Sequence, residues 1–209
     1  MNEILPRRPL VIGAKAPIFS MRTTQGMRTL TDYAGEWLVL FSHPADFTPV
    51  CTSEIISFSR MAAEFDAIGC ALLGLSVDSL HAHLAWVQAI EREFDVKVPF
   101  PIAEDPSMAV AHAYGMIDET AASSATVRST FIIDPEGVIR AISAYPMTTG
   151  RNVAEIKRLV EALQLADAEG VLTPEGWRPG GPVIDADDAL TATSLPPDWF
   201  FRLKEEKAS

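Results

Sequence analysis

The 209-residue sequence has only two cysteines, Cys51 and Cys70. Two cysteines cannot build the disulfide framework that stabilises small secreted domains, and so sparse a pair suits a reducing compartment. Histidine is also scarce, and the four that occur are His43, His81, His83 and His112. None of them shows a recognised ligand spacing with a cysteine, so we expect no metal site.

Long apolar runs and basic residues are both lacking. No apolar run approaches the roughly 20 residues that a membrane-spanning helix needs. The segment Met1–Leu10 has two arginines but neither the apolar core nor the cleavage site of a signal peptide, so we expect a cytoplasmic protein. With 17 basic against 28 acidic residues the net charge is -11, which argues against nucleic-acid binding because phosphates would be repelled. Hydrophobic residues, at 48%, suffice for the core of one domain with an appendage.

The most informative stretch runs from Ser42 to Glu54. It follows Trp37–Phe41, a continuous apolar run typical of a strand buried on both faces. After it, apolar residues recur at spacings of three and four, the period of one helical face: Cys51, Ile55, Phe58, Ala62 and Phe65. The sequence therefore predicts a buried strand that turns directly into a helix.

Cys51 is expected in the first turn of that helix. Thr48 has the side chain of an N-cap and Pro49 is favoured at the first helical position. In a first turn the free backbone N–H groups and the helix dipole favour a thiolate over a thiol, which activates the sulfur. A lone cysteine is more often a packing residue, but packing requires neither a cap nor flanking prolines.

The rest of the chain alternates strands and helices. A buried strand at Ala71–Val77 precedes a helix at Leu80–Phe94, expected to bury Leu84, Val87 and Ile90, which indicates parallel βαβ units. Two apolar runs around a glycine turn, Thr130–Asp134 and Val138–Ile142, predict an antiparallel hairpin, and Asn152–Leu165 predicts a closing helix. This order of elements describes a thioredoxin-like α/β domain, which we assign to residues 1–166.

Residues 167–209 differ from the rest of the chain in composition and are rich in proline and glycine. A flexible tail is one interpretation. However, this segment also carries aromatic residues whose exposure in a free tail would be costly, namely Trp177, Trp199, Phe200 and Phe201. We therefore expect an ordered C-terminal extension.

The residues Pro44, Thr48 and Cys51 spell the Pro-x-x-x-Thr-x-x-Cys signature of the peroxiredoxins, and the stretch from Ser42 to Thr52 resembles the one-cysteine branch of that family. The resemblance implies that Cys51 attacks the O–O bond of hydrogen peroxide or an organic hydroperoxide. It also implies that Pro44 shields the sulfur from water and that the Thr48 hydroxyl orients the peroxide. The segment Gly176–Gly180 resembles the arm that one-cysteine peroxiredoxins lay across a partner subunit, which implies a homodimer or a ring of dimers.

Two arginines and a glutamate are further candidates. Arg128 stands at the start of a buried strand and needs an anionic partner, and the resemblance assigns it to the cysteine sulfur. The alternative is an arginine that extends from the strand end to solvent. The resemblance also implies that Arg151 pairs with Glu54, although an exposed ion pair worth under about 1 kcal/mol is the competing interpretation. His43 either donates to the thiolate or is an ordinary loop histidine.

Cys70 is expected to be structural. It lies beyond the predicted helix, whose roughly 16 residues would span about 24 Å, whereas a disulfide requires Cα atoms within about 7 Å. No cysteine follows it, so the C-terminal Val-Cys-Pro of two-cysteine relatives is absent. An external thiol must then reduce the sulfenic acid.

These observations predict a thiol-specific peroxidase with a role in antioxidant defence and no cofactor. Its expected partners are a hydroperoxide substrate, an external thiol reductant and a second copy of the chain. The alternative is a peroxide sensor or a redox-switched holdase chaperone, which would use the same activated thiolate.

Overall fold

The computed structural model describes residues 9–117, 123–184 and 201–204. The chain forms two compact units, residues 1–153 and 154–209. The boundary that we predicted at 166/167 falls inside the helix α4 (Val153–Glu169). No helix among the described residues is both long enough and apolar enough to cross a membrane.

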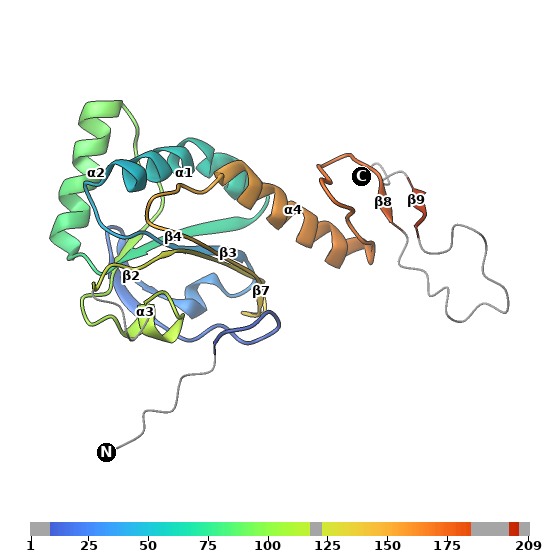
Figure 1. Ribbon diagram of the computed structural model, residues 1–209, viewed down its shortest axis with the longest axis horizontal. Coiled ribbons are helices and arrows are strands. Elements are labelled where there is room, and N and C mark those ends of the chain that lie inside the picture. Colours follow the sequence, from blue (N-terminus) through green and yellow to red (C-terminus); the bar gives the residue numbers. More distant parts are fainter. Residues whose placement is uncertain (1–8, 118–122, 185–200, 205–209) are drawn as a thin grey trace, which may run out of the picture. The chain divides into compact units, whose positions relative to one another are not determined.

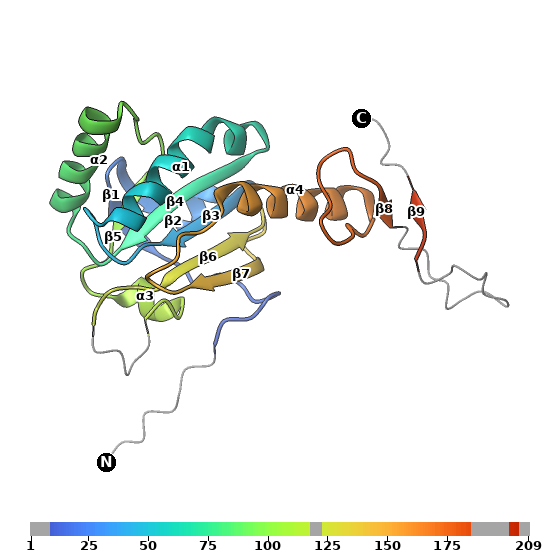
Figure 2. The ribbon, with the colours of Figure 1, turned by 45° about the horizontal axis from the view of Figure 1, so that its top comes forward.

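The described part of the first unit is built on a seven-stranded sheet (Figures 1 and 2). Its strands are β1 (Ser20–Thr23), β2 (Gly26–Thr29), β3 (Trp37–Ser42), β4 (Cys70–Ser76), β5 (Ile102–Glu104), β6 (Arg128–Ile133) and β7 (Ile139–Tyr145). Their order is β2-β1-β5-β4-β3-β6-β7. The pairs β3–β4 and β4–β5 are parallel, and the remaining neighbours are antiparallel. The predicted βαβ units and the hairpin are therefore confirmed.

Helices cover both faces of this sheet. They are the 3-10 turn η1 (Leu30–Tyr33), α1 (Pro49–Ala67), α2 (Leu80–Phe94) and α3 (Ala109–Ala113). The helices α1 and α2 lie on one side and α3 on the other (Figures 1 and 2). Both faces of the sheet are thus packed, which explains why β3 is buried along its whole length.

The side chains of β3 alternate between the two layers. Phe41 stacks on Phe58 of α1, with the ring centroids 4.1 Å apart. Leu38 and Leu40 belong instead to the cluster that contains Tyr114 beside α3. Because β3 is anchored from both sides, the loop that follows it starts from a fixed point.

The helix α2 has the predicted bounds, and its buried face includes Ile90 as predicted but not Leu84. Leu84 is 39% exposed, whereas the buried residues are His83, Trp86 and Ile90. The apolar pattern missed His83 because the partner that allows its burial, Asp46, is a carboxylate far away in the sequence. The helix begins after Ser79, whose hydroxyl accepts a hydrogen bond from the N–H of Ala82.

The second unit has a small core of its own. Trp177 is 5% exposed and packs with Ala162, Val171 and Val183. Its indole N–H donates to the carbonyl of Gly181, and Arg158 donates to the Trp177 carbonyl. The short strands β8 (Val183–Ile184) and β9 (Leu203–Lys204) pair antiparallel. The extension is therefore ordered around Trp177, as expected, while Trp199 and Phe200 lie outside the described residues.

Candidate active site

The loop after β3 delivers Cys51 to the first turn of α1. Thr48 occupies the N-cap position with an extended backbone (φ -97°, ψ 148°), and Pro49 opens the helix, as predicted. The Thr48 side chain does not cap the helix, however, because its hydroxyl donates to the carbonyl of Ala45 at 2.8 Å. Phe47 adopts a left-handed backbone (φ 56°), a conformation that is uncommon outside glycine. Cys51 itself is fully buried, and Pro44 is buried as well.

Arg128 contacts the cysteine sulfur. It is the first residue of β6 and is 2% exposed, so it does not extend to solvent. Its Nη1 lies 3.3 Å from Cys51 Sγ and 2.8 Å from a carboxylate oxygen of Glu54. Its other two nitrogens donate to the carbonyl of Met147. The guanidinium is thus fixed by three acceptors, and the sulfur is one of them.

Glu54 joins the two arginines. Arg151 donates to both of its carboxylate oxygens through Nε (2.9 Å) and Nη2 (2.8 Å), and adds its backbone N–H at 2.8 Å. Both side chains are almost fully buried, so the alternative of an exposed ion pair is excluded. Gly150 allows this approach, because an added Cβ would lie 3.3 Å from Val50 of α1.

The environment of Glu54 keeps it ionised. Burial acts to raise its pKa, but the hydrogen bonds and charge of Arg151, together with the charge of Arg128, outweigh burial and hold the pKa below its ordinary value of 4.5. A carboxylate that is more acidic in the folded chain than in the unfolded one stabilises the fold above the unfolded pKa. That stability is lost as the pH falls through the folded pKa.

We expect Glu54→Gln to lower the free energy of unfolding at pH 7 by about 3 to 5 kcal/mol, because it leaves two buried guanidinium groups without their carboxylate. Urea unfolding of both proteins between pH 7 and pH 3 measures the difference, which should shrink as the pH falls below about 4.5. Glu93→Gln is the control. Glu93 is 61% exposed in its pair with Arg92, so this change should cost under about 1 kcal/mol. A difference for Glu54→Gln that stayed constant down to pH 3 would contradict the assigned charge.

A buried triad adjoins the site. Asp46 accepts a hydrogen bond from His43 Nε2 at 2.8 Å and another from His83 Nδ1 at 2.7 Å. His83 Nε2 in turn lies 3.2 Å from the carbonyl oxygen of Ala103. These three side chains are of the types that bind metals, and their ligand atoms lie within 4.8 Å of one another. Because Asp46 already bonds both rings, a cation would have to displace these hydrogen bonds.

His43 is neutral in this arrangement. Burial is the largest influence and lowers its pKa, although Asp46 acts in the opposite direction. The pKa of Asp46 is itself lowered, because the hydrogen bonds from the two histidines outweigh its burial, so it is an acceptor. The single N–H of His43 therefore points to Asp46, and its Nδ1 has no partner in the part of the chain that the structure describes. Such a ring has no N–H left to donate to the sulfur.

Cys70 occupies a different environment. It is 3% exposed at the start of β4, and burial raises its pKa to about 12. Its sulfur lies 3.7 Å from the carbonyl oxygen of Ala71 and also interacts with the backbone of Val39. Both cysteines are free thiols, and the stretch of α1 from Cys51 to Ala67 spans roughly 24 Å.

Sequence analysis missed three parts of the site: Asp46, His83 and the carbonyl of Met147. Asp46 lies three residues after His43, which is a usable signal for a hydrogen-bonded loop. The other two are brought in from α2 and from the segment after β7, and no local pattern marks them.

Comparisons with known proteins agree with this geometry. Residues 12–142 match the AhpC/TSA family, and residues 162–192 match the C-terminal domain of 1-Cys peroxiredoxin. The chain is 47% identical over 194 residues to a peroxiredoxin of Aquifex aeolicus (strain VF5), a match that covers 92% of this chain and 86% of that one. The chain therefore belongs to the peroxiredoxins, which are thiol-dependent peroxidases.

Comparisons with solved structures narrow the assignment to one branch of this family. A yeast mitochondrial 1-Cys peroxiredoxin, studied for thiol resolution via glutathione/thioredoxin systems, has a TM-score of 0.79 and 45% identity, and the match covers 84% of this chain and 86% of that one. The peroxiredoxin 6 of Arenicola marina has a TM-score of 0.80 and 34% identity, with coverage of 86% and 85%. The protein is thus a thiol peroxidase of the one-cysteine type with a thioredoxin-like fold. The sensor and chaperone alternatives gain no comparable support.

Proposed function

We propose that Cys51 is the peroxidatic residue and that Arg128, Thr48 and Pro44 form the peroxide site around it. The observation that carries this proposal is the 3.3 Å contact between Arg128 Nη1 and Cys51 Sγ in the first turn of a helix. The thiolate attacks one peroxide oxygen, the S–O bond forms as the O–O bond breaks, and the second oxygen leaves as water or an alcohol after it takes up a proton. The sulfur becomes a sulfenic acid.

Arg128 serves the reaction through its charge. A guanidinium beside the sulfur stabilises the thiolate, and it also stabilises the negative charge that develops on the leaving oxygen. Glu54 and Arg151 are positioning residues, because they hold Arg128 through the shared carboxylate without touching the sulfur themselves.

Thr48 and Pro44 complete the peroxide site. Since the Thr48 hydroxyl donates its proton to Ala45, its oxygen presents lone pairs that can accept a hydrogen bond from a peroxide O–H. Buried Pro44 has no N–H and keeps water from the sulfur. Together these features would orient the peroxide with one oxygen toward Cys51.

Reduction of the sulfenic acid falls to an external thiol. The burial and high pKa of Cys70 and its place at the far end of α1 support this assignment. One thiol condenses with the sulfenic acid to a mixed disulfide and releases water, and a second thiol restores Cys51 while a disulfide of the reductant leaves.

Oxidation of the reduced protein by one equivalent of hydrogen peroxide tests the site directly. We expect a sulfenic acid at Cys51, trapped with dimedone and located by mass spectrometry, and an unmodified peptide around Cys70. A trapped adduct at Cys70, with Cys51 still reduced, would contradict the proposal.

The assembly and the compartment are further proposals. The match of residues 162–192 to the C-terminal domain of 1-Cys peroxiredoxin supports residues 167–209 as a dimerisation extension, in a homodimer or in a ring of dimers. Two free cysteines suit a reducing cytoplasm. Sedimentation velocity should give a dimer or a multiple of it, and a monomer at micromolar concentration would exclude this assembly.

A further inference from the structure

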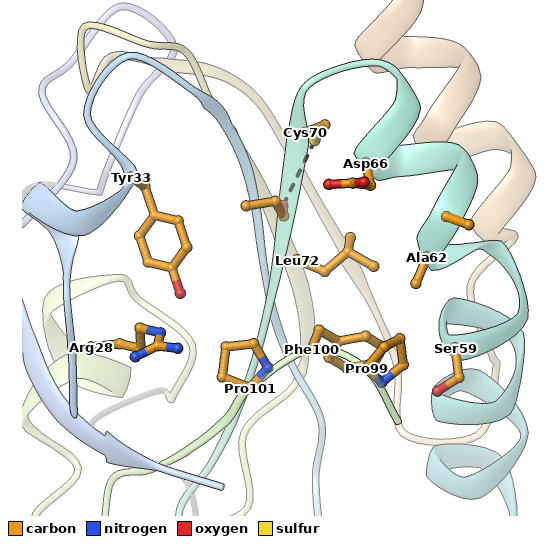
Figure 3. A pocket seen from close by; sticks show the side chains of 12 residues that line it. Arg28, Tyr33, Ser59, Ala62, Asp66, Cys70, Leu72, Pro99, Phe100 and Pro101 are labelled. Carbon is orange, nitrogen blue, oxygen red and sulfur yellow. Dashed lines mark hydrogen bonds between the residues drawn. The ribbon is translucent and has the colours of Figure 1, made fainter. Parts of the chain in front are cut away.

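A cavity of about 500 Å³ lies on the first unit away from Cys51 (Figure 3). Arg28 and Tyr33 line one side, α1 lines the other with Ser59, Ala62 and Asp66, and β4 lies between them. Ser59 follows Cys51 by eight residues, about 12 Å along the helix. The cavity is therefore separate from the peroxide site.

Two buried hydroxyls lie at this cavity. Tyr33 is only 9% exposed and its hydroxyl interacts with the Arg28 side chain, whereas the Ser59 hydroxyl finds no hydrogen-bond partner among the described residues. Leaving a buried hydroxyl without a partner is unfavourable, so such groups point to a missing ligand or solvent. Burial raises the pKa of Tyr33 to about 12, against the opposing effect of the nearby Arg28, so the hydroxyl keeps its proton and can donate.

Arg28 adds a positive charge beside Tyr33. Its guanidinium lies next to the Tyr33 hydroxyl in Figure 3 and donates to the carbonyl of its neighbour Met27. Its charge contributes to lowering the pKa of Asp32, after the hydrogen bonds that this carboxyl receives from Thr29, but Arg28 and Asp32 are not within ion-pair distance in the described ranges. A half-buried cation and a hydroxyl donor side by side suit the oxygens of an anionic head group.

The remainder of the cavity is apolar. Its walls include Leu72 and Phe100, two prolines at 99 and 101, and two alanines of α1 at 62 and 63. Its volume falls within the range of about 300 to 1,000 Å³ that is typical of small-molecule sites. The space therefore suits a ligand whose body is hydrocarbon or aromatic.

A polyanion fits poorly. The part of α1 that lines the cavity is its C-terminal half, where the helix dipole is negative. Asp66 adds a full negative charge on that side. The net charge of -11 also repels highly charged anions. One acidic group near Arg28 is thus favoured, and a second one near Asp66 is not.

We propose that this cavity binds an amphipathic organic acid, with its carboxylate on Arg28 and Tyr33 and its apolar body between Leu72, Phe100 and α1. The site is independent of peroxide reduction. The single cation and the apolar walls of the cavity favour such an acid over a nucleotide or a free phosphate.

Isothermal titration calorimetry with decanoate tests the site on the full chain, and decanol serves as the probe with the same apolar body and no charge. We expect saturable 1:1 binding of decanoate, with binding weakened about ten- to hundredfold in Arg28→Met because a charge-assisted hydrogen bond is lost. Arg60→Met is the matched control, since it removes one positive charge from an exposed position of α1 outside the cavity. That variant should bind decanoate as the wild type does.

Ala62→Phe fills the cavity and should abolish binding, while peroxide consumption stays unchanged in all three variants. The proposal is overturned by no saturable heat with millimolar decanoate, by equal affinity for decanol and decanoate, or by unchanged decanoate affinity in Arg28→Met. If Ala62→Phe fails to fold by circular dichroism, the Arg28→Met comparison decides. The binding measurements do not depend on peroxidase activity. A failure of the proposed peroxide site and a failure of this binding site can therefore be told apart.

Discussion

Replacing Cys51 with serine is expected to reduce peroxide turnover by more than about a thousandfold, as loss of a nucleophile does in other enzymes. A serine hydroxyl does not ionise near neutral pH, so the attacking anion disappears even though Arg128 remains in place. Steady-state peroxide consumption with dithiothreitol as reductant measures the effect.

Cys70→Ser is the matched control and should retain turnover within about twofold. Cys70 is buried at the opposite end of α1, and its raised pKa keeps it a thiol. The substitution exchanges a sulfur for a hydroxyl that can donate to the Ala71 carbonyl, so a stability loss of about 1 kcal/mol is expected. A folded Cys70→Ser protein as inactive as Cys51→Ser would show that both cysteines take part in the cycle.

Arg128→Met should slow the single-turnover oxidation of Cys51 by about a hundredfold or more, the usual cost of losing one donor that stabilises developing charge. The change keeps the length of the side chain and removes the cation. It also leaves the Glu54 carboxylate near the sulfur with one arginine instead of two, which disfavours the thiolate further. Stopped-flow oxidation by hydrogen peroxide, beside the pH profile of Cys51 alkylation, separates the loss of thiolate from the loss of peroxide activation.

Arg128→Lys tests whether charge alone suffices. A lysine carries the charge, but it cannot reach the sulfur, Glu54 and the Met147 carbonyl at the same time, so we expect a rate between those of the wild type and Arg128→Met. Arg92→Met, which removes a 69% exposed arginine from α2, is the control for net charge. Oxidation of Arg128→Met at the wild-type rate would place the guanidinium outside the reaction.

Local patterns in the sequence were sufficient to predict the element that carries Cys51. The apolar run of β3, the cap position of Thr48 and the proline after it are all adjacent in the chain, and the structure has them as predicted. The end of α4 was placed four residues too early, at Leu165 instead of Glu169. The signal that stops the helix is Gly170, whose left-handed backbone (φ 63°) was not used in the prediction.

The bridge that Glu54 forms between Arg128 and Arg151 could not be predicted in the same way. Sequence and resemblance together paired Arg128 with Cys51 and Arg151 with Glu54, and both contacts are present. The link between Arg128 and Glu54 depends on the register of β6 beside β3, which places two distant segments against one face of α1. The same limitation applies to His83, because its burial follows from a carboxylate 37 residues away.

The shared carboxylate of Glu54 also sets a balance of charge that changes during the catalytic cycle. With Cys51 as a thiolate, two guanidinium groups face one carboxylate and one sulfur anion, and the buried group is electrically neutral. A sulfenic acid carries no charge, so oxidation leaves one positive charge in a place with almost no access to water, which is costly. Oxidation of Cys51 therefore replaces a neutral buried group by one with an uncompensated positive charge, which favours water or an anion beside the sulfur.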